Sequence, residues 1–165
     1  MTTDSYNKMA ASIKKNKILL NTIVLLNNLL TYVCYVIYPV LIVILLISHQ
    51  KQLMLRCLLV PGISFIIVSV FRRFVNFKRP YEELDIEPLI YKATTGNSFP
   101  SRHVFSAFII AMCWLNYVPV VAVILFFVGV IMAIVRVICG VHYPKDVICG
   151  ALIGIIAGII GFYII

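Results

Sequence analysis

Charged residues are scarce in this sequence, and acidic residues are scarcer still. The 165 residues include 14 Lys or Arg and six Asp or Glu, so 12% of the chain is charged and the formal net charge is +8. Ordinary globular domains carry about 25% charged residues. With 62% hydrophobic residues and a mean hydropathy of +1.06, the composition excludes an ordinary soluble domain and predicts an integral membrane protein.

The sequence also lacks the patterns that are typical of metal sites, disulfide frameworks or nucleic-acid binding. None of its five cysteines forms a Cys-x-x-Cys pair, so neither a zinc site nor a disulfide framework is predicted. It has no interleaved basic and aromatic pattern of the kind that indicates nucleic-acid binding. No signal-peptide cleavage site follows the polar, basic N-terminus. We therefore expect no cofactor, no metal and no nucleic-acid partner.

The sequence does contain several long apolar runs. About 20 mostly apolar residues are needed to span a membrane as a helix. Five spans are expected, at Leu29–Ser48, Leu53–Val70, Val104–Leu115 with its flanking residues, Pro119–Val135 and Val147–Ile165. The fold class is therefore all-α, a polytopic transmembrane helix bundle that forms one domain over residues 1–165.

The N-terminal region is apolar over too few residues to be a clear span. Ile18–Leu26 is apolar, but Asn27 and Asn28 separate it from the next span. We expect an interfacial or half-inserted helix from about Ser5 to Asn28, with its lysines at the lipid headgroups. A short sixth span is the alternative.

Three glycines recur every four residues in the last expected helix, at Gly150, Gly154 and Gly158. They share one face, where a neighbouring helix can approach closely. Packing within the chain is favoured over a dimer interface, and the sequence leaves the oligomeric state open.

Asp146 is the only acidic residue in the C-terminal half of the chain, and His142 precedes it by four positions. Charge within an apolar stretch is costly, so such residues are functional by default. On a helix or helix-like turn the pair lies on one face, within hydrogen-bonding reach. The carboxylate would fix the tautomer of His142 and leave its other nitrogen to attack. The structural alternative makes His142 a packing residue and Asp146 the N-cap of the last helix; the two roles can coexist.

Basic residues gather in two loops that must open on the same side of the membrane. The loops, Arg72 to about Ser98 and Arg136–Asp146, are separated by two spans. Guanidinium groups offer a planar fork of donors suited to phosphate oxygens. Four arginines are candidate phosphate ligands: Arg72, Arg79, Arg102 and Arg136. Four other charges, Glu82, Glu83, Asp85 and Glu87, are interpreted as a solvated face of the first loop.

The segment Pro100-Ser101-Arg102-His103 has the composition of a helix start. The free N–H groups of a first helical turn bind anions, so Ser101 and Arg102 are expected to hold a phosphate there. His103 would lie one turn in, close enough to pass a proton. A zinc site built from the two histidines and Asp146 is disfavoured, because the arginines would repel the cation.

Three motifs in this order resemble those of the type 2 phosphatidic acid phosphatase (PAP2) superfamily. They are Arg72-x6-Arg79-Pro80, Pro100-Ser101-Arg102-His103 and Arg136-x5-His142-x3-Asp146. The resemblance covers roughly residues 50 to 165. Three positions depart from the family pattern: Arg72 stands for lysine, Arg102 for glycine and Val135 for serine. Both histidines and the aspartate are kept, so activity is expected.

The resemblance implies a metal-independent phosphatase that works in two steps. His142 would attack phosphorus and form a phosphohistidine, with Asp146 orienting it. His103 would protonate the leaving alkoxide and then activate water. The phosphoryl oxygens would be bound by Arg72, Arg79, Ser101, Arg102 and Arg136.

The small, membrane-embedded chain favours a lipid phosphate or diphosphate as substrate. Undecaprenyl diphosphate, phosphatidylglycerol phosphate and phosphatidate are the candidates, and membrane lipids are the expected surroundings. One alternative is a phosphotransferase that passes the phosphoryl group to another acceptor. The other is a non-catalytic lipid-phosphate binder or transporter.

The expected location is the plasma membrane, but two span counts give opposite orientations. With five spans the lysine-rich tail and the site share a side, which the positive-inside rule places in the cytoplasm. With six spans the site faces outward. The outward site is preferred, because it satisfies more of the non-catalytic charge and because family members that act on envelope lipids generally face outward.

Overall fold

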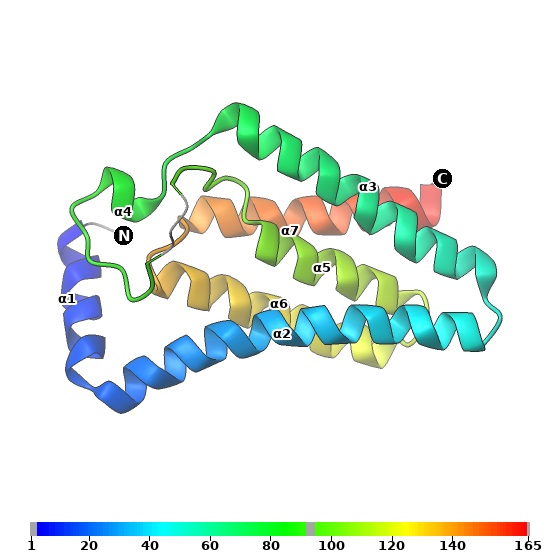
Figure 1. Ribbon diagram of the computed structural model, residues 1–165, viewed down its shortest axis with the longest axis horizontal. Helices are drawn as coiled ribbons and strands as arrows, with labels where there is room; N and C mark the ends of the chain where they lie inside the picture. The colour runs from blue at the N-terminus through cyan, green and yellow to red at the C-terminus, as the bar shows by residue number, and fades with distance from the viewer. Residues whose placement is uncertain (1–2, 92–94, 165) are drawn as a thin grey trace.

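The computed structural model describes residues 3–91 and 95–164, and this part of the chain is helical without strands. The helices are α1 (Thr3–Lys15), α2 (Lys17–Ile47), α3 (Lys51–Val75), α4 (Pro80–Glu83), α5 (Arg102–Leu115), α6 (Pro119–Ile138) and α7 (Pro144–Ile159), which continues as the π-helical turn η1 (Ile160–Ile164). Figure 1 shows α2, α3, α5, α6 and α7 running along the long axis, with α1 across one end. The predicted all-α membrane bundle is confirmed.

Four stretches of helix are long and apolar enough to cross a membrane. They are Lys17–Ile47, Lys51–Glu83, Pro119–Ile138 and Pro144–Ile164. The 14 residues of α5 rise only about 21 Å at 1.5 Å per residue, which is less than the roughly 30 Å hydrocarbon core of a bilayer. The expected span at Val104–Leu115 is therefore a shorter apolar helix than the other four. Helix α5 contacts α2, α3, α6 and α7, so it forms the short centre of the bundle.

The N-terminal region differs from the sequence-based expectation in two respects. A break before Leu29 was expected at Asn27 and Asn28, but α2 runs through both residues. Asparagine costs only about 0.7 kcal/mol in a helix interior relative to alanine, and here the Asn27 side chain donates to Oδ1 of Asn28 at 3.1 Å. The break lies at Asn16, whose side chain caps α2 by accepting a hydrogen bond from the Leu19 N–H.

The predicted N-terminal helix corresponds in part to α1, which ends at Lys15 rather than near Asn28. Residues 17–28 belong to α2, so no short sixth span precedes Leu29 in the described residues. Helix α1 is amphipathic rather than apolar and buries only Tyr6, Ala10 and Ile13. It is tied to the loop between α3 and α5 by a hydrogen bond from Asn7 to the Asp85 carbonyl and by the Lys14–Glu87 ion pair at 2.6 Å. The N-terminus thus lies on the same side of the bundle as this loop.

The glycine face of α7 packs within the chain, against α5. A Cβ atom added at Gly150 would lie 2.6 Å from the Ser101 carbonyl oxygen, and one at Gly154 would lie 2.8 Å from the Phe105 carbonyl oxygen. Such distances leave no room for a side chain. The predicted close approach is confirmed, and it brings the first turn of α7 against the first turn of α5.

Candidate active site

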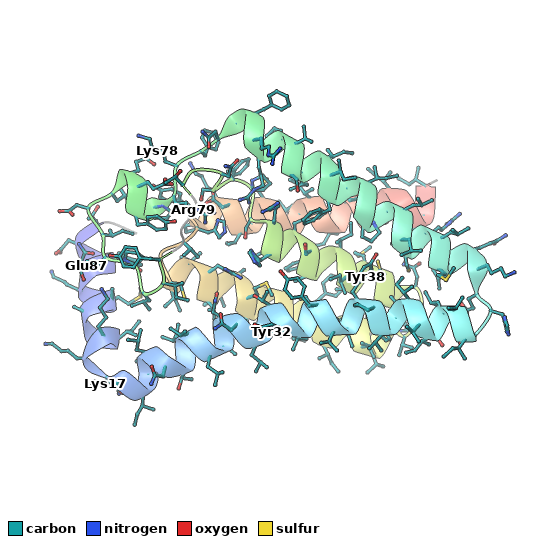
Figure 2. The ribbon with its side chains drawn as sticks, in the orientation of Figure 1. Lys17, Tyr32, Tyr38, Lys78, Arg79 and Glu87 are labelled. Carbon is teal, nitrogen blue, oxygen red and sulfur yellow. The ribbon has the colours of Figure 1, made fainter. Side chains whose placement is uncertain are left out.

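The two polar loops meet at the end of the bundle where α1 lies, as their shared side predicted (Figure 1). The Leu89 N–H donates to the Cys139 carbonyl at 3.2 Å, which joins the loop after α4 to the α6–α7 connection. Arg79 Nη1 donates to the Val141 carbonyl at 3.2 Å. In Figure 2, Arg79 lies inside this loop cluster, whereas its neighbour Lys78 lies at the outer edge.

Asp146 is the centre of the buried polar network. Its Oδ2 accepts hydrogen bonds from the Ser98 hydroxyl at 2.5 Å and from the Tyr143 N–H at 2.9 Å. His142 Nδ1 lies 3.5 Å from the same oxygen and 3.4 Å from Ser98 Oγ. His142 and Asp146 are 2% and 0% exposed. Because Nδ1 faces the carboxylate, Nε2 is on the opposite edge of the imidazole ring.

Asp146 is not the N-cap of the last helix, as the structural alternative supposed. Tyr143 is the N-cap of α7, Pro144 is the first helical residue and Asp146 is the third. The carboxylate accepts from the N-cap backbone N–H, so it closes the first turn from inside. A proline at the first helical position is well suited, because its missing N–H would have no partner there. This turn fixes the carboxylate that faces His142.

Burial controls the charge of His142. Loss of solvent around the ring lowers the pKa of His142 to about 4, and the hydrogen bond to Asp146 opposes that shift without cancelling it. Nearby Arg79 and Arg136 lower it further. At neutral pH the imidazole is neutral, which is the form that can act as a nucleophile.

The Arg72 side chain is occupied mainly by hydrogen bonds to the protein backbone. Its guanidinium donates to the backbone carbonyls of Asn97, Ser98 and Pro100. It lies in the last turn of α3 and is 5% exposed. The geometry makes Arg72 a clamp on the segment that leads into α5, beside any contribution to anion binding.

Two buried arginines keep a donor without a partner among the described residues. Arg79 bonds Val141 and Arg136 bonds Thr31 Oγ1 at 3.0 Å, but the Nε atoms of both arginines are unpaired. Buried donors without partners are rare and require an explanation. An anion held between these side chains would satisfy them. Thr31, which orients Arg136, was not predicted, because a lone threonine in an apolar run gives no signal.

The start of α5 supplies a second set of groups. Ser101 is the N-cap, yet its buried hydroxyl makes no capping bond and has no partner among the described residues. Its own N–H donates to the Asp146 carbonyl at 2.9 Å, so the start of α5 is tied to the first turn of α7. His103 is half-buried and lines a cavity of about 160 Å³ together with Tyr35, Ser106 and other residues.

Arg102 points to α3 rather than into the Asp146 network. It is exposed, its Nη1 donates to Ser69 Oγ at 3.4 Å, and its guanidinium lies 5.5 Å from the centre of the Phe65 ring. Of the predicted residues, the structure therefore joins His142, Asp146 and Ser101 directly, whereas Arg102 is set to one side.

The acidic residues at 82–87 are not merely a solvated face. Glu82 is half-buried and accepts from the backbone N–H groups of Arg79 and Gly96 at 2.7 and 2.9 Å. Glu83 accepts from the Tyr143 hydroxyl at 2.8 Å. Two of these acids thus hold the loops around the site. The contact of Ser98 with Asp146 was not predicted.

Comparison with known proteins agrees with these motifs. The model of the PAP2 superfamily matches residues 53–165. The crystal structure of LpxE from Aquifex aeolicus is similar, with a TM-score of 0.72 and 29% identity, over 96% of this chain and 92% of that chain. A transmembrane PAP2-type phosphatidylglycerolphosphate phosphatase from Bacillus subtilis has the same fold, with a TM-score of 0.72 and 21% identity, over 96% and 83% of the two chains. No curated protein sequence gives a significant match.

Proposed function

The chain belongs to the PAP2 superfamily and is an integral membrane phosphatase, and on that premise we propose that it hydrolyses a lipid phosphate or diphosphate through a phosphohistidine at His142. The observation that carries this proposal is the buried network of Ser98, Asp146 and His142, bordered by arginine donors without partners. A neutral histidine held by a carboxylate, facing a site for an anion, is suited to attack on phosphorus.

In the first step His142 Nε2 forms a bond to phosphorus while the bond to the lipid oxygen breaks. Asp146 accepts a hydrogen bond from the Nδ1–H of His142 and stabilises the positive charge that develops on the ring. Ser98 and the Tyr143 N–H hold the carboxylate in place. These contacts support Asp146 as the group that fixes the tautomer of His142.

His103 is proposed as the acid of the first step and the base of the second. It is the second helical residue of α5, two positions after the N-cap Ser101, and it lines the 160 Å³ cavity. Protonation of the leaving oxygen by a positioned side chain contributes typically 10²- to 10⁴-fold. In the second step His103 takes a proton from water, which attacks the phosphohistidine and releases inorganic phosphate.

The phosphate oxygens of the substrate are proposed to bind Arg72, Arg79, Ser101, Arg102 and Arg136. The unpaired donors of Arg79, Arg136 and Ser101 are the best placed for this role. In phosphoryl transfer, catalysis is almost entirely positioning and electrostatic stabilisation of the equatorial oxygens. Arginines in a dry site supply that stabilisation without a metal, so the reaction is proposed to be metal-independent.

A lipid substrate is supported by the placement of the site in a membrane bundle. The similar structure from Bacillus subtilis is a phosphatidylglycerolphosphate phosphatase, although its 21% identity supports the fold alone. Phosphatidylglycerol phosphate, phosphatidate and undecaprenyl diphosphate are the substrates we propose to compare.

The outward orientation of the site in the plasma membrane stays a prediction, and its sixth-span premise is absent from the structure. Helix α1 brings Lys8, Lys14 and Lys15 to the side of the site. With five spans the positive-inside rule favours a cytoplasmic site. Labelling of Lys78→Cys in intact cells with a membrane-impermeant maleimide, in a chain whose own five cysteines are replaced, decides between the two. Labelling means an outward site, and protection until lysis means a cytoplasmic one.

The proposed function is tested by phosphate release from the purified protein in detergent with EDTA present. The three lipids are assayed in parallel, with His142→Ala as the inactive variant and His49→Ala, an exposed histidine in the α2–α3 turn, as the matched control. Release by the wild type and by His49→Ala alone supports metal-independent hydrolysis at His142. Transfer of phosphate to another lipid without release would indicate a phosphotransferase. Lipid binding without any reaction would indicate a binder, and either result would overturn the hydrolase.

A further inference from the structure

A hollow rich in arginine lies between α3 and the start of α5, beside the candidate active site. It has a volume of about 440 Å³, and four of its lining residues are Arg72, Arg73, Arg79 and Arg102. The described residues that line it include no acid. One water in the liquid takes up about 30 Å³. The hollow therefore has room for several waters, and it is larger than one phosphate group of five heavy atoms requires.

Arg79 connects this hollow to the catalytic loop. Its Nη1 bonds the carbonyl of Val141, which adjoins His142, and its side chain also lines the hollow. Arg79 therefore contacts both the loop that carries His142 and the hollow that Arg102 lines. Like charges gathered at a membrane surface repel one another, and a bound anion is the group that relieves this repulsion.

Arg102 differs from Arg72 in having donors to spare. Arg72 is committed to three backbone carbonyls. Arg102 makes one side-chain hydrogen bond within the described residues, a long one to Ser69, and it is held against the Phe65 ring. A guanidinium has five N–H donors, and stacking on an aromatic ring orients them. Arg102 is thus a cation held in position at the hollow by Ser69 and Phe65.

We propose that Arg102 binds a second phosphate of the substrate, next to the one transferred, so that the enzyme selects an alkyl diphosphate over the alkyl monophosphate of the same chain. This inference rests on the proposed function. The terminal phosphate lies at His142 and the inner phosphate lies in the hollow. The hollow is also lined by three apolar residues of α3, Phe65, Ile66 and Val70, which would contact the alkyl chain.

The reaction balances without any further reactant than water. His142 Nε2 bonds to the terminal phosphorus, and the bond from that phosphorus to the bridging oxygen breaks. The electron pair stays on the bridging oxygen, so the alkyl monophosphate is the leaving group and Arg102 stabilises the charge that it gains. Water then cleaves the phosphohistidine, which yields inorganic phosphate and regenerates His142. The alkyl monophosphate is the product that accumulates.

The test compares farnesyl diphosphate with farnesyl monophosphate, in detergent with EDTA, for the wild type and variants at Arg102. The wild type is expected to have a kcat/KM about tenfold or more higher for the diphosphate. Arg102→Gln should lower that ratio by about tenfold or more, since a hydrogen bond to a charged group is lost. Arg102→Lys should restore part of the ratio. Lys78→Gln removes one exposed charge near the site but outside the hollow, so it should keep the ratio.

Two results would overturn the inference while leaving the proposed function intact. One is a wild type that hydrolyses both farnesyl esters with equal kcat/KM. The other is an equal loss on both esters in Arg102→Gln, which would mean that Arg102 acts on the transferred phosphate or on the fold. A folded wild type that hydrolyses neither these esters nor the three lipids would instead overturn the proposed function itself.

Discussion

Helices α5 and α3 both contribute to the site, but they are packed in opposite ways. Ten of the 14 residues of α5 are buried, whereas four of the 25 residues of α3 are buried. The start of α5 touches the backbone of α7 at Gly150, where a Cβ would lie 2.6 Å from a carbonyl oxygen. Gly62 in α3 has open space around the same position, with nothing within 4 Å.

This difference separates the chemistry from the recognition of the rest of the substrate. Ser101 at the start of α5 is joined by a backbone hydrogen bond to Asp146 in the first turn of α7, so the reactive geometry is set where two backbones touch. The outer helix α3 presents Phe65 and Ser69 to Arg102 along a hollow. We infer that substitutions at the α5–α7 contact lower the rate on every substrate, whereas those on α3 change the choice of substrate.

The largest effect at the inner contact is expected from Asp146→Asn. The substituted amide cannot accept from Ser98, Tyr143 and His142 as the carboxylate does. Loss of the carboxylate that fixes a catalytic histidine lowers kcat by about 10⁴-fold in the best-studied triad, and we expect a loss of that order. Asp4→Asn, at an exposed ion pair with Lys8 in α1, is the matched control and should keep full activity. A loss below tenfold in Asp146→Asn would contradict this role.

The next largest effect is expected at Gly150, and it compares the close α5–α7 contact directly with the open surface of α3. Gly150→Ala forces a methyl group against the Ser101 carbonyl, so we expect a loss of about 1–3 kcal/mol in stability from overpacking. The displaced first turns should lower kcat by about 10²-fold. Gly62→Ala, where the space is open, should keep the rate and should not lower the melting temperature, because alanine also favours a helix. Both substitutions are measured by phosphate release and thermal unfolding. If Gly150→Ala is tolerated as well as Gly62→Ala, the α5–α7 contact does not set the reactive geometry.

The sequence predicted the parts of the site that follow from pattern and topology. The His142–Asp146 spacing gave the contact, the glycine repeat gave the close helix pair, and the count of spans between two loops gave their shared side. Each of these depends on periodicity or on connection order, which a sequence contains directly.

Other parts depend on where the chain goes between elements, and the sequence did not predict them. The contact of Ser98 with Asp146 requires the path of a long irregular loop. The pairing of Thr31 with Arg136 joins residues 105 positions apart. Helix α2 continues through Asn27 and Asn28 because its apolar residues, Leu30 and Leu41 among them, pack in the bundle, which outweighs the weak helix preference of two asparagines.

A smaller effect is expected from Ser98→Ala, which removes one of the hydrogen bonds that hold the Asp146 carboxylate. Tyr143 N–H and His142 remain as partners, so the carboxylate stays in place but less firmly. We expect kcat to fall about tenfold, in line with roughly 1–3 kcal/mol for a buried polar group left without its partner. Ser48→Ala, an exposed serine at the opposite end of the bundle, should not change kcat. An unchanged kcat in Ser98→Ala would show that the contact of Ser98 with Asp146 does not contribute to catalysis.

The smallest effect concerns the proton on His142, and it tests how dry the inner contact is. Burial lowers the pKa of His142 to about 4 in the folded chain, whereas an unfolded histidine has a pKa of about 6.5. Between these values the unfolded chain binds a proton that the folded chain does not. The free energy of unfolding therefore falls as the pH drops from about 6.5 toward 4, because protonation of His142 stabilises the unfolded chain there. Above about pH 6.5 this loss is absent. NMR of histidines labelled with ¹³C, assigned by His142→Gln, should show a midpoint near 4 among three ring signals. The wild type should also lose more thermal stability than His142→Gln between pH 7 and pH 4.5. A midpoint at or above 6.5 would mean that water reaches His142, and the contrast between a dry inner contact and an open outer helix would then fail at the residue where it matters most.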